Sequence, residues 1–168
     1  MPPQKSFLRN VWLSAGALRL AMNLWPPFVG AGIHVLGISP DYREVRVRMR
    51  LRWYNRNYMG THFGGSLYAM TDPFYVLMML HNLGRDYIVW DKASNIRYRA
   101  PGRRTVFADF RITEAQIAEA RARTEGGARY EPTLSVDVVD RDRRVIATVE
   151  KTLFIRRASA TDSRKLAA

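Results

Sequence analysis

The sequence contains no cysteine and comparatively few acidic residues. Without cysteine, disulfides, thiolate chemistry and cysteine zinc sites are excluded, and nothing indicates an oxidising compartment, so we expect a cytoplasmic protein. The 168 residues include 27 Lys and Arg but only 15 Asp and Glu, which gives a formal net charge of +12. Such a charge favours anionic partners, but it does not distinguish nucleic acid, anionic lipid, a phosphorylated cofactor and an acidic carrier protein.

A long hydrophobic run is also missing. The apolar stretch from residue 11 to residue 30 is interrupted by Arg19 and by Pro26 and Pro27, so it falls short of the roughly 20 apolar residues that a membrane-spanning helix needs. No small-residue cleavage site follows a clean apolar core. We therefore expect residues 1–30 to be an extension of two short amphipathic helices packed on the domain. Contact with a membrane surface is the less favoured alternative.

Residues 44–53 alternate between apolar and basic side chains, which predicts a half-buried strand. The apolar side would carry Val45, Val47, Met49, Leu51 and Trp53, and the other side Arg46, Arg48, Arg50 and Arg52. We expect these arginines to lie on the surface or at a subunit contact. Five more segments have strand composition and turn residues between them. They are residues 33–39, 87–100, 105–112, 130–139 and 145–156.

Residues 64–81 have apolar side chains at helical spacing and at most other positions, which predicts a buried helix. A capping-box pattern from Thr113 to Gln116, followed by Gly126 and Gly127, predicts a short surface helix in a strand connection. The order of elements indicates an α+β domain over residues 31–157, in which an antiparallel sheet of about six strands wraps around a central helix. We expect residues 158–168 to form a disordered basic tail.

Asp72 is the only formally charged residue between Arg56 and Arg85. A carboxylate in such an apolar segment loses hydration and needs hydrogen bonds or a cation in compensation. Catalysis is one explanation, and capping of a helix that has Pro73 at its first position is the other. Because helical spacing runs unbroken from Leu67 through Phe74, a cap would place Pro73 within a helix, so we favour catalysis.

A motif precedes this carboxylate: Asn57, Gly60, His62, Gly64 and Gly65. With Asp72, these residues resemble the signature of hotdog-fold acyl-CoA thioesterases of the phenylacetate-pathway type. The runs Thr61 to Leu67, Thr71 to Phe74 and Trp90 to Ala93 resemble, more narrowly, an uncharacterised DUF4442-like branch of that superfamily. The resemblance covers most of residues 30–156. One departure is Phe63, which is inserted between His62 and the two glycines.

The resemblance implies a hotdog fold and an acyl-CoA or acyl-carrier-protein hydrolase. It implies that Asp72 is the general base or nucleophile and that the Gly65 N–H stabilises the oxyanion. In the resembling enzymes the acid and the glycine of one site come from different subunits, which implies a homodimer or homotetramer. No cofactor beyond the coenzyme A of the substrate is implied.

The remaining candidate residues have weaker support. His62 and Asn57 would orient water or the thioester carbonyl, although a structural histidine in a turn is the alternative for His62. The expected substrate-binding residues are Gly64, Thr71, Arg97, Arg99 and Arg103, of which Thr71 would hold the carboxylate and the arginines would meet phosphates or form a solvated strand end. No cluster of His, Asp and Glu has metal-ligand spacing, so we expect no metal site.

Two other functions remain open. The run His62, Phe63 and Gly64 is similar to the histidine motif of hydroxyacyl-carrier dehydratases, which suggests an acyl-thioester hydratase or dehydratase. The other alternative is a non-catalytic protein that binds acyl thioesters or polyanions. Binding to nucleic acid is disfavoured because the arginine-rich strand has no interleaved aromatic residues for base stacking.

Overall fold

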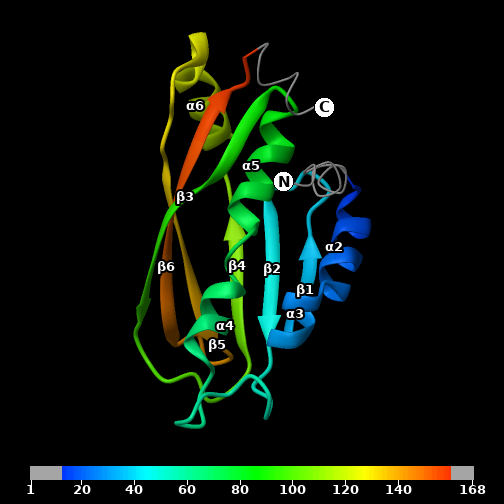
Figure 1. Cartoon of the computed structure of the whole chain (residues 1–168), viewed down its shortest axis with the longest axis vertical. Coiled ribbons are helices and arrows are strands. Elements are labelled where there is room, and N and C mark those ends of the chain that lie inside the picture. Colours follow the sequence, from blue (N-terminus) through cyan, green and yellow to red (C-terminus); the bar gives the residue numbers. More distant parts are fainter. Residues whose placement is uncertain (1–12, 160–168) are drawn as a thin grey trace, which may run out of the picture.

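The computed structural model describes residues 13–159, in which a six-stranded antiparallel sheet curves around a central helical segment (Figure 1). The order of the strands across the sheet is β1-β2-β4-β5-β6-β3. The strands are β1 (Ile33–Ile38), β2 (Glu44–Met49), β3 (Tyr87–Tyr98), β4 (Val106–Arg111), β5 (Thr133–Asp140) and β6 (Val145–Arg157). The helices are α2 (Ala15–Leu24), α3 (Pro26–Ala31), α4 (Gly64–Ala69), α5 (Phe74–Leu83) and α6 (Glu114–Arg123), followed by the 3-10 turn η1 (Glu125–Gly127). All six predicted strands are therefore present.

Helix α5 forms the centre of the core. Phe74, at its first position, is completely buried, and its ring lies 4.9 Å from that of Phe110 in β4 and 6.1 Å from that of Phe28 in α3. The next residue, Tyr75, donates its hydroxyl to the Ser135 carbonyl at 2.6 Å, and burial raises the pKa of Tyr75 to about 12. Aromatic packing thus joins α5 to the sheet and to the leader helices, with the one polar tip satisfied.

The central helix is interrupted where continuous helix was predicted. Helix α4 ends at Ala69 and α5 begins at Phe74, with Asp72 in the turn between them. The N–H of Asp72 donates to the Ala69 carbonyl at 3.2 Å, so the carbonyl that Pro73 cannot reach is still satisfied. Both segments carry buried apolar residues, which explains why the sequence reads as one helix.

Strand β2 is shorter than predicted. Val45, Val47 and Met49 are buried as expected, but pairing with β4 ends at Met49, and Trp53 is 80% exposed. The chain then turns because the side-chain oxygen of Asn55 accepts the Arg52 N–H at 2.7 Å. The alternation of residues 50–53 therefore continues in a loop and not in a strand.

The predicted leader helices are present as α2 and α3. Asn23 of α2 donates to the Val35 carbonyl at 3.0 Å and accepts the Val35 N–H at 2.7 Å, which covers part of the outer edge of β1. Between residues 13 and 159 no helix has the length and apolarity needed to cross a bilayer. The first twelve residues of the expected extension, and residues 160–168 of the expected tail, lie outside the described residues.

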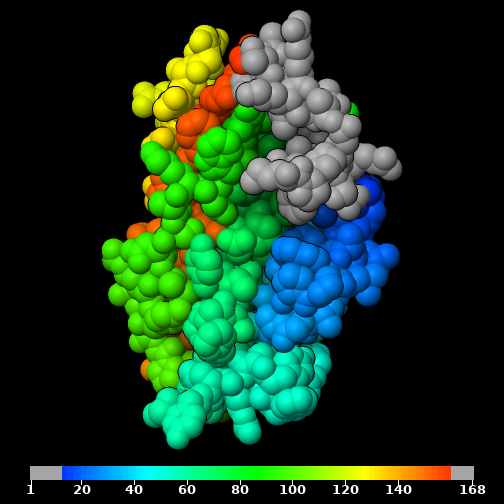
Figure 2. Space-filling model, in the orientation of Figure 1, coloured from blue at the N-terminus to red at the C-terminus, as the bar shows by residue number. Residues whose placement is uncertain are grey.

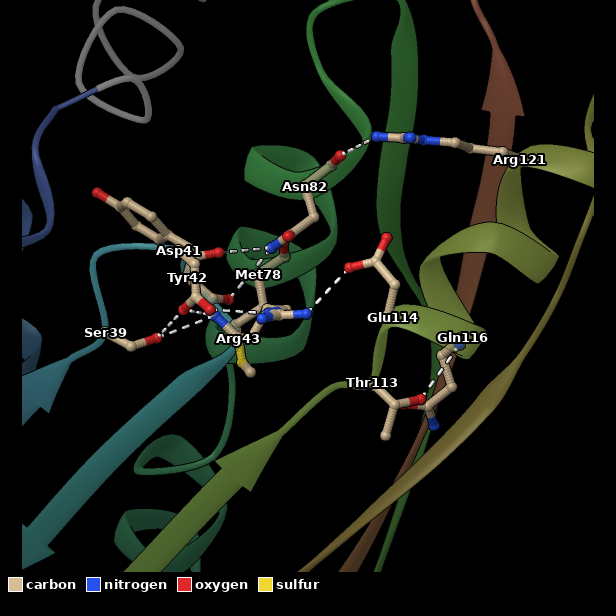
Figure 3. A network of polar contacts seen from close by, with 10 residues as sticks. All are labelled: Ser39, Asp41, Tyr42, Arg43, Met78, Asn82, Thr113, Glu114, Gln116 and Arg121. Carbon is tan, nitrogen blue, oxygen red and sulfur yellow. Dashed lines mark hydrogen bonds and ion pairs between the residues drawn. The ribbon is translucent and has the colours of Figure 1, made fainter.

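A polar network surrounds the turn between β1 and β2 (Figure 3). The Arg43 guanidinium pairs with Asp41 at 2.8 Å and with Glu114 of α6 at 2.9 Å, and Asn82 of α5 donates to the Tyr42 carbonyl at 3.3 Å. The predicted capping box from Thr113 to Gln116 begins α6. These contacts connect the β1–β2 turn to both helices.

We predict that Phe74→Ala lowers the free energy of unfolding by about 3–5 kcal/mol, because a fully buried phenylalanine is removed from a packed core. Phe63→Ala is the matched control: Phe63 is 56% exposed, so its loss should lower stability by less than about 1 kcal/mol. Urea denaturation followed by circular dichroism measures both. Equal losses would contradict the placement of Phe74 at the centre of the core.

Candidate functional site

Asp72 meets a buried lysine at the α4–α5 turn. The Lys151 ammonium, on a side chain with no exposed surface, donates to Asp72 Oδ1 at 2.8 Å, to the Asp72 carbonyl at 3.0 Å and to Asp91 Oδ2 at 3.0 Å. These three acceptors use all three N–H groups of the ammonium. The Asp72 side chain is 52% exposed, so the lysine holds a carboxylate that solvent still reaches.

Sequence reasoning missed Lys151, although a signal for it exists. Along β6, Ala147, Val149, Leu153 and Ile155 are buried on one face, and the period of two places Lys151 on that same face. A lysine in such a row needs acidic partners. In β3 a register irregularity between Asp91 and Ala93 interrupts the ladder beside it, and bulges of this kind redirect side chains.

The three charged groups of this cluster differ in how deeply they are buried. Burial opposes protonation of Lys151, but hydrogen bonds to Asp72 and Asp91 outweigh it and raise the pKa of the lysine, which therefore stays an ammonium. Burial raises the pKa of Asp91, and its Oδ1 is buried without a hydrogen-bond partner among the described residues. Asp72 is thus the more accessible carboxylate of the two.

Asp72 is not a helix cap. The N-cap of α5 is Pro73, and no side chain caps this end of the helix. Thr71, expected to hold the carboxylate, is fully buried and donates its hydroxyl to the Tyr68 carbonyl at 2.7 Å. The carboxylate is held by Lys151 instead.

Gly64 and Gly65 begin α4, directly after Phe63. Neither N–H donates a hydrogen bond to any of the described residues, as expected for the first turn of a helix. A Cβ at Gly65 would lie 2.5 Å from the Phe63 ring, and a Cβ at Gly64 would lie 2.7 Å from the Tyr98 hydroxyl. A side chain at either position would therefore displace a neighbouring, half-exposed aromatic ring.

Asn57 organises the turn before these glycines. Its side-chain oxygen accepts the N–H groups of Met59 at 2.9 Å and Thr61 at 3.1 Å, while its amide donates to the Thr61 hydroxyl at 2.9 Å. Gly60 has a φ of +73°, which favours glycine. The Asn57 side chain is thus used within its own turn.

His62 is 2% exposed and is held by the segment that follows β3. Its backbone N–H donates to the Gly102 carbonyl at 2.9 Å. The ring atom Nε2 lies 2.8 Å from the Arg104 carbonyl, so Nε2 carries the proton. Burial lowers the pKa of His62, and Nδ1 is buried without a partner among the described residues. Within residues 13–159, no hydrogen bond links this ring to Asp72. His62 and Asp72 therefore belong to separate sets of hydrogen bonds.

The predicted phosphate-binding arginines are exposed along the end of β3 and the loop after it. Arg97 lies 3.9 Å from Glu150, a long surface ion pair, and the Arg99 N–H donates to the Ile146 carbonyl at 2.8 Å. Arg103 is exposed in the loop. In the described part of the chain, no group of three or more His, Asp or Glu side chains is placed to hold a metal.

Solved structures with the same architecture identify the fold. A protein of unknown function from Pseudomonas aeruginosa, described as a probable thioesterase, has a TM-score of 0.73 at 20% identity over 83% of this chain and 93% of its own. A thioesterase from Haemophilus influenzae has a TM-score of 0.64 at 14% identity over 86% of this chain and 92% of its own. The PaaI protein of the E. coli phenylacetic acid degradation operon has a TM-score of 0.59 at 15% identity over 90% and 95%.

The sheet, the central helix and these neighbours define a protein of the hotdog fold. Within that class, residues 15–155 match the domain of unknown function DUF4442, and the chain belongs to this family. No curated protein matches the sequence significantly. The predicted fold and the predicted family are both confirmed.

We predict that stability falls as the pH drops below 6.5, the ordinary pKa of histidine. Because burial lowers the pKa of His62 in the native state, the unfolded chain takes up a proton first and is favoured by acid. Urea denaturation at about pH 7.5 and about pH 5.5 measures the effect. His62→Gln should flatten the dependence. The pKa of His34 is lowered too, but its side chain is exposed, so His34→Gln should retain most of the dependence. An unchanged slope in His62→Gln would contradict the role of burial.

Proposed function

We propose that this protein hydrolyses acyl thioesters, with acyl-CoA or acyl-carrier protein as substrate. The observation that carries the proposal is the Asp72 carboxylate, which a buried ammonium orients at the surface of a hotdog domain. Two of the structural neighbours are described as thioesterases, one of them as probable, which supports the reaction class by analogy of fold.

In the proposed reaction, Asp72 acts as the general base. Lys151 contacts Oδ1, while Oδ2 accepts no hydrogen bond from the described residues and can take a water proton. The water oxygen attacks the thioester carbonyl, whose oxygen becomes negative. Collapse of this intermediate breaks the carbon–sulfur bond, and the proton on Asp72 passes to the departing thiolate. Attack by the carboxylate itself is the covalent variant.

The Gly65 N–H is the proposed oxyanion donor, and Gly64 allows the thioester to approach the backbone. The support is that both N–H groups are without an acceptor in the described residues. Helix α4 has only six residues, so the N–H groups themselves, and not a helix dipole, would stabilise the oxyanion. Asn57 and His62 then act as positioning residues that shape this turn, since their polar atoms contact the backbone around it.

We also propose that the protein is a homodimer or homotetramer in the cytoplasm. Strand β3 is twelve residues long, lies at one edge of the sheet and exposes most of its side chains beyond Asp91. An open edge of this length offers backbone groups for pairing with a second copy. Such pairing would bring the glycine turn of one subunit toward the Asp72 of another. Arg97, Arg99 and Arg103 would meet substrate phosphates, and Thr71 would support the turn from beneath Asp72 without touching substrate.

We predict that Asp72→Asn reduces thiol release from an acyl-CoA panel by about 10²- to 10⁴-fold, the range for loss of a general base. The amide is nearly isosteric, so the fold should persist. Asp137→Asn is the control, because Asp137 is an exposed carboxylate of β5 that accepts the Thr148 hydroxyl. Full activity in Asp72→Asn would remove Asp72 from the reaction. Acyl-CoA binding without thiol release by the wild type would favour a binding protein.

We predict that Lys151→Met lowers both stability and thiol release. Removing one member of a buried ion pair costs about 3–5 kcal/mol, and the half-exposed Asp72 should bring the loss to about the lower limit. Lys92→Met is the matched control from the neighbouring strand: its side chain is 50% exposed and pairs with Glu131, so its loss should cost less than about 1 kcal/mol.

Urea denaturation and the pH dependence of kcat separate the structural from the positioning role of Lys151. A change in the pH profile, in protein that remains folded, supports positioning of the carboxylate. Lys151→Met with wild-type stability and an unchanged profile would contradict both roles.

A further inference from the structure

The leader helices α2 and α3 expose an apolar surface. Leu20 is 60% exposed, Leu24 69%, Val29 55% and Trp25 41%. Between residues 15 and 30 the only charged residue is Arg19. A helix on the surface of a soluble domain normally presents polar residues to water, and this pair of helices does not.

Helix geometry places these residues opposite the packed face. Leu18 and Met22 are one turn apart and are buried against the domain. Leu20 and Leu24 are also one turn apart, but each lies about half a turn from that buried row. Helix α2 is thus apolar on both sides, and its contacts with β1 cover only one of them. An apolar face this large on a monomer typically marks an interaction site.

A basic cluster adjoins this surface. His34 of β1 lies directly opposite Arg48 of β2 in the sheet register. Partial burial lowers the pKa of His34, and the charges of Arg48, Arg19 and Arg50 lower it further, so each of the three lies near enough to act on this ring. None of the three forms an ion pair with a carboxylate in residues 13–159, and Arg48 Nε is buried without a hydrogen-bond partner there.

The loop after β2 also lacks acidic residues and exposes an aromatic side chain. From Arg50 to Thr71 the sequence has no acidic residue. The Tyr54 hydroxyl lies 3.2 Å from the position of a Cβ on Gly32, so the loop packs against the end of α3. Trp53 beside it is 80% exposed. Figure 2 shows the leader helices in blue and this loop in teal as neighbouring parts of one face.

We propose that this protein docks on anionic phospholipid membranes through its leader surface, defined as Leu20, Leu24, Trp25 and Val29 together with Arg19, Arg48 and Arg50. The apolar side chains would enter the boundary between headgroups and acyl chains, where tryptophan is favoured, and the arginines would meet lipid phosphates. Charge complementarity favours this occupant, because the cations beside the apolar face have no acidic partners among residues 13–159. The proposal is independent of the hydrolase activity.

The test is binding of the full-length protein to sedimented lipid vesicles. Vesicles with about one-third phosphatidylglycerol in phosphatidylcholine should bind it, and pure phosphatidylcholine should bind it at least about fivefold more weakly. Added salt should weaken the binding, because the electrostatic part is screened. Leu20→Ser with Leu24→Ser should reduce the partition coefficient at least about tenfold through lost apolar insertion. Arg50→Gln should reduce it about fivefold.

Two matched controls locate the effect. Trp90→Ser with Tyr98→Ser removes two half-exposed aromatic side chains of β3, at the sheet edge opposite β1, and Arg129→Gln removes one exposed cation near β5. Both should bind as the wild type does, and circular dichroism should show that all variants remain folded.

Several results would overturn the proposal. They are no binding of the wild type to either vesicle, equal losses in the leader variants and the controls, or a leader variant that dissociates an oligomer in light scattering while binding vesicles normally. The last result would assign the surface to a second copy of the chain.

Discussion

A buried ammonium constrains the centre of this structure. Lys151 lies on the core face of β6, where an unpaired charge would be strongly destabilising, so its three N–H groups require acceptors. Asp91 supplies one from the edge strand β3, and Asp72 supplies two from the turn between α4 and α5. The break in the central helix and the irregular register of β3 therefore meet at one cation. The carboxylate proposed for catalysis is also part of what keeps the core electrostatically neutralised.

The sequence predicts the strands well because their signal is local. Val45, Val47 and Met49 alternate with arginines and are buried, and the same period identifies the other strands. Trp53 continues the alternation but is exposed, because a strand ends where its partner ends and not where its pattern does. The contact between Asp72 and Lys151 joins residues 79 apart, so no spacing rule reveals the pair. Only the position of a lysine in the apolar row of β6 indicated that an acid had to lie opposite.

The motif that carries the family resemblance contributes mostly structure. Asn57 closes the turn, Gly60 permits its backbone conformation, and His62 fastens it to the segment around Gly102. These residues place Gly64 and Gly65 with open N–H groups, and Phe63 packs over the second of them. The histidine that a dehydratase would pair with an acid is thus committed to the Arg104 carbonyl. Spacing identified the motif, but only side-chain contacts distinguish residues that position a site from residues that meet a substrate.

The ion pairs show which of the cations behind the net charge of +12 are neutralised locally. Around the turn between β1 and β2, Asp41 and Glu114 neutralise Arg43. On the neighbouring strands β2 and β4, Asp109 neutralises Arg46. Arg19, Arg48 and Arg50, by contrast, form no ion pair among residues 13–159, and Arg19 belongs to α2 itself. Charge alone would attract any polyanion, and apolar exposure alone would suit any hydrophobic partner. An anionic bilayer surface offers both lipid phosphates and hydrocarbon, so it would satisfy the arginines and the apolar side chains together.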